Sequence, residues 1–98
     1  MTTSVFMIVI ASINEGEEKA LNTYLQGLIK LYDNVSARVM HNYHITSRMV
    51  GENPVDMVSV IAFPNREAIA EVYDSEEYQV LIRFRDQAFR RLEVLLSA

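Results

Sequence analysis

The sequence predicts an α+β fold in which a four-stranded antiparallel sheet carries helices on one face. Two segments, Val5–Ile13 and Val55–Phe63, are apolar at successive positions, as is typical of strands buried on both faces. Each is followed by a segment whose apolar residues recur at helical spacing. The chain has 98 residues, half of them hydrophobic, which fits one globular domain over residues 1–98.

The first strand, Val5–Ile13, is uncharged and lies near the N-terminus. It does not read as a signal peptide, because residues 1–4 carry no positive side chain. It is also much shorter than the roughly 20 residues that a membrane helix requires. We therefore expect a central strand of a cytoplasmic protein.

An amphipathic helix follows. Asn14 with Glu17 resembles a capping box, and Asp33–Asn34 is expected to end the helix, with Asn34 in the left-handed conformation. The apolar stripe of this helix comprises Leu21, Tyr24, Leu25, Leu28, Leu31 and Tyr32.

The segment Ser36–Val50 alternates weakly between apolar and polar residues, which predicts an edge strand. Strict alternation places Val39, His41 and Tyr43 on one face, and Arg38, Met40, Asn42 and His44 on the other. Gly51–Pro54 then forms a turn before the second central strand.

After that strand, Pro64–Asn65 is expected to cap a short helix that turns Ala68, Ile69, Val72 and Tyr73 inward. Asp74 with Glu77 resembles a second capping box, so a new helix is predicted over about Ser75–Arg90. Leu92–Leu96 is the last strand.

The resulting order, β-α-β-β-α-β, is the ferredoxin-like arrangement, whose central strands are the first and the third. Its helices cover one face of the sheet, and the other face would here be apolar and bare. Leaving about six large apolar side chains in water would forfeit on the order of 10 kcal/mol. We therefore predict a homodimer through the open sheet face, a dimeric α/β barrel.

Composition limits the function. The net charge of −4 disfavours nucleic acid as a partner, and the absence of cysteine excludes disulfides and thiolate metal sites. No glycine-rich phosphate loop or nucleophile elbow occurs, and we predict no cofactor.

Arg85 is the most informative single residue, because it lies within the expected inward stripe of Tyr78, Leu81, Ile82, Phe89 and Leu92. A guanidinium there pairs with a carboxylate at the edge of the core, extends outward so that its charge reaches solvent, or contacts an anionic ligand. Tyr73 and Tyr78 flank the helix break and either pack or line the same site.

His44 is the candidate general base, since imidazole titrates near neutral pH. It is expected to share a polar face with Asn42 and Arg48, which are candidate ligand-binding residues, or to be an ordinary exposed histidine. His41 lies three residues away, on the opposite face of a strand, which opposes a shared metal site.

The stretches Phe63–Ala68 and Val72–Leu81 resemble the F-P-S-x-E-A and F-Y-x-S-x-E-Y-Q-x-L patterns of the bacterial domain-of-unknown-function family 1330, in the dimeric α/β-barrel superfamily. Gly51–Pro54 is similar to its hairpin turn. The chain departs from the family at Ser36–Ala37, where members carry a glycine pair, and at Asn42–His44, where they carry an Arg-Gly-Gly-like stretch. The resemblance implies the fold and the dimer, and carries no established activity.

Two functional hypotheses stay open. In the first, the dimer binds or transforms a small anionic or aromatic metabolite in a cleft between helices and sheet, as cofactor-free enzymes of similar barrel shape do. In the second, it is a non-catalytic dimerisation or metabolite-sensing module. A pocket of about 300 Å³ with convergent polar groups would favour the first. A filled cleft with Arg85 paired internally would favour the second.

Overall fold

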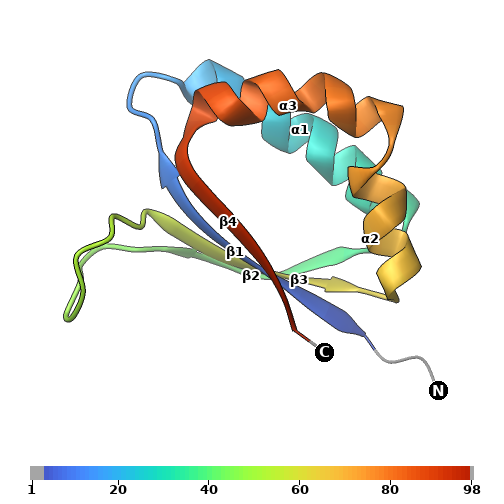
Figure 1. Ribbon diagram of the computed structural model, residues 1–98, viewed down its shortest axis with the longest axis horizontal. Coiled ribbons are helices and arrows are strands. Elements are labelled where there is room, and N and C mark those ends of the chain that lie inside the picture. Colours follow the sequence, from blue (N-terminus) through green and yellow to red (C-terminus); the bar gives the residue numbers. More distant parts are fainter. Residues whose placement is uncertain (1–3, 98) are drawn as a thin grey trace.

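The computed structural model describes residues 4–97, so Met1, Thr2 and Thr3, whose lack of charge entered the signal-peptide argument, lie outside the described residues. No helix within that range is long and apolar enough to cross a membrane. In chain order the elements are β1 (Val5–Ile13), α1 (Glu18–Asn34), β2 (Arg38–His44), β3 (Met57–Phe63), α2 (Arg66–Tyr73), α3 (Glu76–Ala88) and β4 (Phe89–Ser97) (Figure 1).

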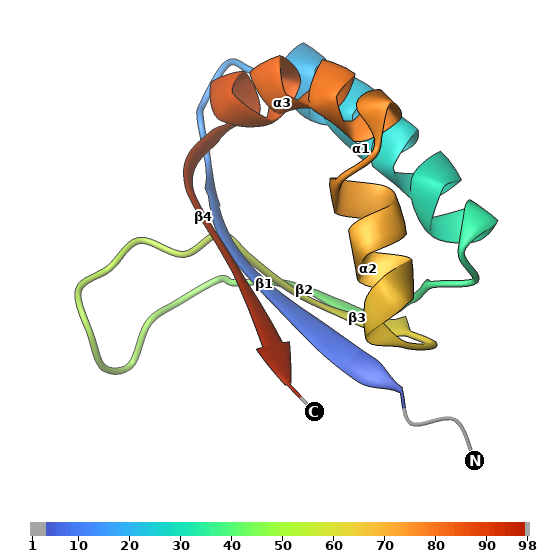
Figure 2. The same ribbon diagram turned by 45° about the vertical axis from the view of Figure 1, so that its right-hand side comes forward.

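The sheet is antiparallel, with the strand order β2-β3-β1-β4. The predicted central strands, β1 and β3, are therefore confirmed as the central pair, and both views show the helices gathered over one face (Figures 1 and 2). This is the α+β, ferredoxin-like fold that the sequence predicted.

The covered face holds the core. Met7 of β1, Phe63 of β3 and Val72 of α2 are almost completely buried beneath the helices. The predicted inward stripe of α1 is confirmed in part, because Tyr24, Leu28 and Tyr32 are buried. The other three predicted residues are only half-buried, and the buried Ala20 was not predicted; the half-buried residues are Leu21, Leu25 and Leu31. Gly27 allows α1 to lie close to α3, because a Cβ atom there would come within 2.6 Å of a methyl group of Leu81.

The opposite face of the sheet, called the open face below, carries apolar residues that no helix covers. On β1 these residues are Phe6, Ile8 and Ile10, which pair across the sheet with Ala62, Val60 and Val58. Cross-strand partners lie on the same face, so the apolar surface continues from β1 onto β3. It extends onto β4 through Leu95, which pairs with Ile8 and is 49% exposed.

The first predicted capping box is wrong. Helix α1 begins after Glu17, which caps it with no side-chain hydrogen bond. Asn14 instead donates from Nδ2 to the carbonyl oxygen of Gln87, at 3.0 Å, and so ties the start of α1 to the end of α3. At the other end of α1, Ser36 and not Asn34 adopts the left-handed conformation, with φ of 59°.

The second capping box is wrong by one residue. Ser75 and not Asp74 caps α3, since its Oγ accepts a hydrogen bond from the backbone N–H of Tyr78 at 3.0 Å. The predicted cap of α2 is confirmed, because Asn65 Oδ1 accepts from the backbone N–H of Ala68 at 2.8 Å.

Two strand boundaries also differ from the prediction. The edge strand β2 ends at His44, so Arg48 lies in the loop that follows and not in the strand. Strand β4 begins at Phe89, directly after the last residue of α3, so Phe89 and Leu92 belong to the sheet and not to the stripe of the helix.

Strand β2 contains a bulge that strict alternation does not anticipate. Val39 pairs with Ile61 and His41 pairs with Val60, so Met40 is an extra residue between them. Val39 consequently shares the helix side of the sheet with Asn42 and His44, where alternation had placed it with His41 and Tyr43.

Candidate functional site

A cavity of about 310 Å³ lies between helix α1 and the covered face of the sheet. Its walls are mostly aliphatic and aromatic, with polar groups from β2, β3 and the helices. The lining residues are Val9, Tyr24, Leu25, Leu28, Ile29, Tyr32, Val39, Asn42, Met57, Ser59, Ile61, Tyr73, Phe89, Leu92 and Val94. Its size lies at the lower end of the range for small-molecule sites.

Four tyrosines from the helix layer meet beside this cavity as two hydrogen-bonded pairs. The hydroxyl groups of Tyr24 and Tyr78 are 2.9 Å apart, and those of Tyr32 and Tyr73 are 2.7 Å apart. The rings of Tyr73 and Tyr78 also contact each other, with centroids 4.6 Å apart, which joins the pairs into one cluster. Tyr73 and Tyr78, the predicted site residues, thus lie together.

Burial extends to higher pH the range over which three of these hydroxyl groups stay protonated. It raises the pKa of Tyr24, Tyr32 and Tyr73 well above the ordinary value of 10.0, because an ionised phenolate would lose its hydration there. These groups therefore stay neutral at physiological pH. They offer O–H donors to a neighbour or to a bound molecule.

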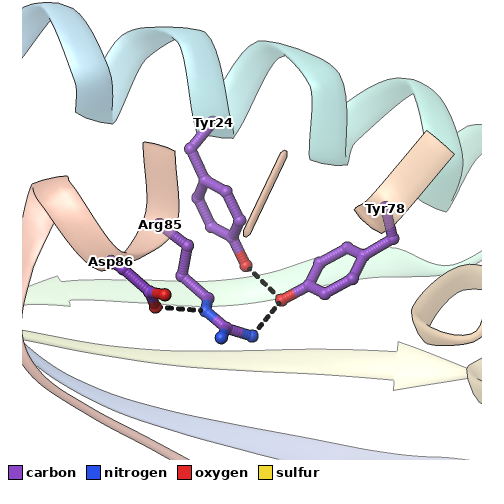
Figure 3. A network of polar contacts seen from close by, with 4 residues as sticks. All are labelled: Tyr24, Tyr78, Arg85 and Asp86. Atoms are coloured by element: carbon purple, nitrogen blue, oxygen red, sulfur yellow. Dashed lines mark hydrogen bonds and ion pairs between the residues drawn. The ribbon is translucent and has the colours of Figure 1, made fainter. Parts of the chain in front are cut away.

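Arg85 extends the cluster toward solvent. Its Nη1 donates to the Tyr78 hydroxyl at 3.2 Å, and its Nε to Oδ1 of Asp86 at 3.2 Å (Figure 3). Burial lowers the pKa of Arg85, but its hydrogen bonds to Tyr78 and Asp86 outweigh this and leave that pKa raised. The side chain is 29% exposed, so the guanidinium is accessible from outside.

A second hollow, of about 300 Å³, brings Arg85 next to the apolar cavity. Met7, Ile69, Tyr78, Arg85 and Leu96 line it, and it shares Tyr73, Leu92 and Val94 with the first cavity. The two spaces therefore adjoin along β4 and Tyr73. We refer to these two neighbouring spaces together as the cleft, and the guanidinium of Arg85 lines the second of them.

The β2 side of the cleft is polar. The hydroxyl of Ser59 donates to Oδ1 of Asn42 at 2.8 Å, and both residues line the cavity. With Oδ1 occupied, the Nδ2 group of Asn42 is the part of the amide left to donate to a bound molecule. Asn42 was a predicted site residue, and the structure brings it into the same cavity as Tyr73.

The structure does not bring the other two predicted site residues to this cavity. His44 is exposed at the last position of β2, opposite Met57. Arg48 lies in the loop between β2 and β3, where its Nη1 donates to the carbonyl oxygen of Asn53 at 2.9 Å.

Sequence reasoning missed three polar residues of the cavity: Tyr24, Tyr32 and Ser59. Ser59 carried a usable signal, as the polar exception inside an otherwise apolar central strand. Tyr24 and Tyr32 appeared only as members of the apolar stripe. That they share hydroxyl partners on α3 and α2 depends on helix packing, which no local pattern reveals.

The fold and the cleft together define a ferredoxin-like α+β domain. Within that class, the sequence profile of the family described as "Domain of unknown function (DUF1330)" matches residues 4–98, and the chain belongs to this family. No curated protein sequence matches the chain.

Solved structures share the fold at low sequence identity. A protein of unknown function from Rhodopseudomonas palustris superposes with a TM-score of 0.88 at 12% identity, covering 99% of this chain and 82% of that one. A dimeric protein of unknown function with a ferredoxin-like fold, from Bacteroides fragilis, gives 0.61 at 11% identity, over 99% and 98% of the two chains. A protein of the EthD family from Bacillus halodurans superposes with a TM-score of 0.65 at 14% identity, over 98% of each chain.

Proposed function

We propose that this protein is a homodimer that binds a small, mainly apolar molecule carrying one anionic group in the cleft between helices and sheet. The observation that carries the proposal is the cavity of about 310 Å³ with its adjoining hollow at Arg85. Its apolar walls suit an aromatic or aliphatic body, and its few polar groups suit the orientation of such a molecule.

The anionic group is assigned to Arg85. The guanidinium has five N–H donors, and its contacts with Tyr78 and Asp86 use two of them. The others can receive a carboxylate, which is the group that this planar donor set recognises best. The neutral hydroxyl of Tyr73 and the amide of Asn42 would then orient the rest of the ligand.

The dimer rests on the open face of the sheet. Phe6 of β1 and Leu95 of β4 are 38% and 49% exposed there, and both belong to the apolar surface that runs across the strands. Pairing with a second copy would bury them, and the Bacteroides fragilis neighbour shows that a protein of this fold can be dimeric.

A non-catalytic sensing role is the second candidate. It is favoured by the internal partners of Arg85, because hydrogen bonds to Tyr78 and Asp86 give the guanidinium a structural role that involves no reaction. The predicted base, His44, lies outside the cavity, so among the described residues no histidine lines the space where a compound would bind. We expect His44→Ala to leave the binding of a compound unchanged, and turnover of a bound compound by the wild type would contradict the sensing role.

The test is a thermal-shift screen with small aromatic and aliphatic carboxylic acids, run on the wild type and on Arg85→Ala. A ligand present at 100 times its Kd should stabilise the wild type by about 2.7 kcal/mol, and most of this should be lost in the variant. Arg83→Ala, which removes an exposed arginine from the same helix, is the matched control. An equal response of wild type and Arg85→Ala would remove Arg85 from the site, and no response to any acid would overturn the anionic ligand.

A further inference from the structure

The loop between β2 and β3, residues 45–56, is longer than the sheet requires. It has twelve residues, whereas two to five are enough to connect antiparallel neighbours in a hairpin. Loops approaching this length without secondary structure are uncommon in compact domains. We call residues 45–56 the arm.

The arm has a defined base. At its ends, Ile45 N–H donates to the carbonyl oxygen of Asp56, at 2.8 Å. Asp56 is itself attached to β1, because its N–H donates to the carbonyl oxygen of Ala11 and its Oδ2 accepts from Ile13 N–H, both at 2.8 Å. These bonds fix the direction in which the arm leaves the sheet.

The arm is also braced internally. The Arg48 guanidinium donates to the carbonyl oxygen of Asn53 at 2.9 Å and so connects its two halves. Gly51 turns the chain with φ of +105°, a conformation that residues with a Cβ rarely adopt. Arg48 therefore stabilises the conformation of the arm.

The tip of the arm is apolar and almost wholly in water. Met49 is 97% exposed and Val50 is 92% exposed, more than any other large hydrophobic residue within residues 4–97. These two adjacent apolar side chains bury almost no surface against their own chain, so they add almost nothing to its folding stability. Their position makes sense if another surface covers them.

The direction of the arm identifies that surface. In both views the arm leaves the ends of β2 and β3 and curves away from the helices, toward the side of the open face (Figures 1 and 2). The open face is itself apolar, with Phe6 and Leu95 exposed. A partner that covers the open face would therefore lie beside the tip of the arm.

We propose that the arm grips the second copy of the chain, with Met49 and Val50 buried against the partner at the edge of the open-face interface. This inference rests on the proposed homodimer and adds a contact to it. A second copy fits better than an unrelated protein, because twofold pairing through the open face brings both arms into contact at once. Each arm then buries its apolar tip without a further binding surface.

The test compares dimer dissociation constants by sedimentation equilibrium. We expect the double variant Met49→Ser/Val50→Ser to weaken the dimer by at least about tenfold relative to the wild type, since two apolar side chains lose their buried surface. Val80→Ser, which changes an exposed apolar residue on α3 far from the open face, is the matched control and should leave the constant unchanged. A second variant replaces residues 46–54 with Asn-Gly and should weaken the dimer at least as much. Far-UV circular dichroism checks that each variant is folded.

The possible results distinguish failure of the arm proposal from failure of the homodimer proposal. A dimeric wild type whose constant is unchanged in both arm variants overturns the arm and leaves the homodimer intact. A monomeric wild type overturns both. Arm variants that stay dimeric but lose the response to carboxylic acids would make the loop a lid over the cleft, which also contradicts the proposal.

Discussion

Alternate residues of the same strands form the two faces of the sheet, but the helices bury only one of these faces. On β1, Met7 points under the helices and is 1% exposed, while its neighbour Phe6 is 38% exposed on the open face. Both are large and apolar, so their side chains do not explain the contrast. The helix layer does, because it supplies partners to one face alone. The covered face is completed within the chain, and the open face finds no cover within the described residues.

The largest expected effect is on the covered face. Phe63 is 0% exposed and packs edge to face against Tyr32, with ring centroids 5.3 Å apart. We expect Phe63→Ala to lower the free energy of unfolding by about 3–5 kcal/mol, because it leaves a cavity in the core. Urea denaturation at a fixed protein concentration measures this. A loss below about 1 kcal/mol would show that this face is less tightly packed than its burial indicates.

A change on the open face should act on association and not on the fold. We expect Leu95→Glu to weaken the dimer by about 2–3 kcal/mol, on the order of 100-fold in Kd, since a carboxylate would be buried in an apolar interface. The circular dichroism spectrum should stay that of the wild type. Val80→Glu on α3 introduces the same charge away from the interface. If it weakens the dimer equally, net charge and not the open face is responsible.

Alkaline pH should weaken the covered side of the molecule. In the folded chain the pKa of Tyr24, Tyr32 and Tyr73 lies above the 10.0 of the unfolded chain, so the unfolded state releases these protons first. Stability is therefore fully present below pH 10 and is lost as the pH rises above it, by up to about 1.4 kcal/mol per pH unit for each tyrosine.

Urea denaturation between pH 9 and 11.5 checks this prediction. Tyr73→Phe should reduce the slope of stability against pH above pH 10, and Tyr43→Phe, on the exposed β2 strand, serves as its control. Equal slopes for the wild type and Tyr73→Phe would contradict the link between burial and protonation at this hydroxyl.

The smallest expected effect tests whether the faces are independent. Ser75→Ala removes the cap of α3 and should cost about 1 kcal/mol of folding stability, because the N–H of Tyr78 loses its acceptor. The dimer constant should not change, since α3 lies on the covered side. A tenfold weaker dimer would show that loosening the helix layer is transmitted through the sheet.

The sequence was sufficient for the fold because period and composition agree along most of the chain. The apolar runs at β1 and β3 identified the central strands, and helical spacing identified α1 and α3. The wrong predictions concern helix caps, where the choice of a single residue decides where the helix begins. Asn14 has the chemistry of a cap, but a carbonyl oxygen at the end of α3 competes for its amide. Ser75 displaced Asp74 as a cap by one position, which local preferences do not resolve.

The site was only partly accessible from the sequence. Arg85, Tyr73 and Tyr78 were identified because a charged residue and two tyrosines at a helix break stand out locally. The cavity itself arises where α1 lies over β1 and β3, and its depth depends on packing between segments far apart in the sequence. Ser59 and Asn42 meet across strands because of a register that the sequence did not show.

That register has a consequence for how the cleft is specified. The extra residue Met40 sets which of the following side chains of β2 face the helices. Asn42 therefore lines the cavity because of its position after the bulge and not because of the chemistry of its amide. If Met40 instead paired with Val60, as strict alternation requires, every later residue of β2 would change sides, and the rings of His41 and Tyr43 would face the cleft where the amide of Asn42 now lies. One unpaired backbone position at the edge of the sheet thus decides which side chains of β2 line the pocket, and deleting Met40 would straighten the strand while leaving that lining unchanged.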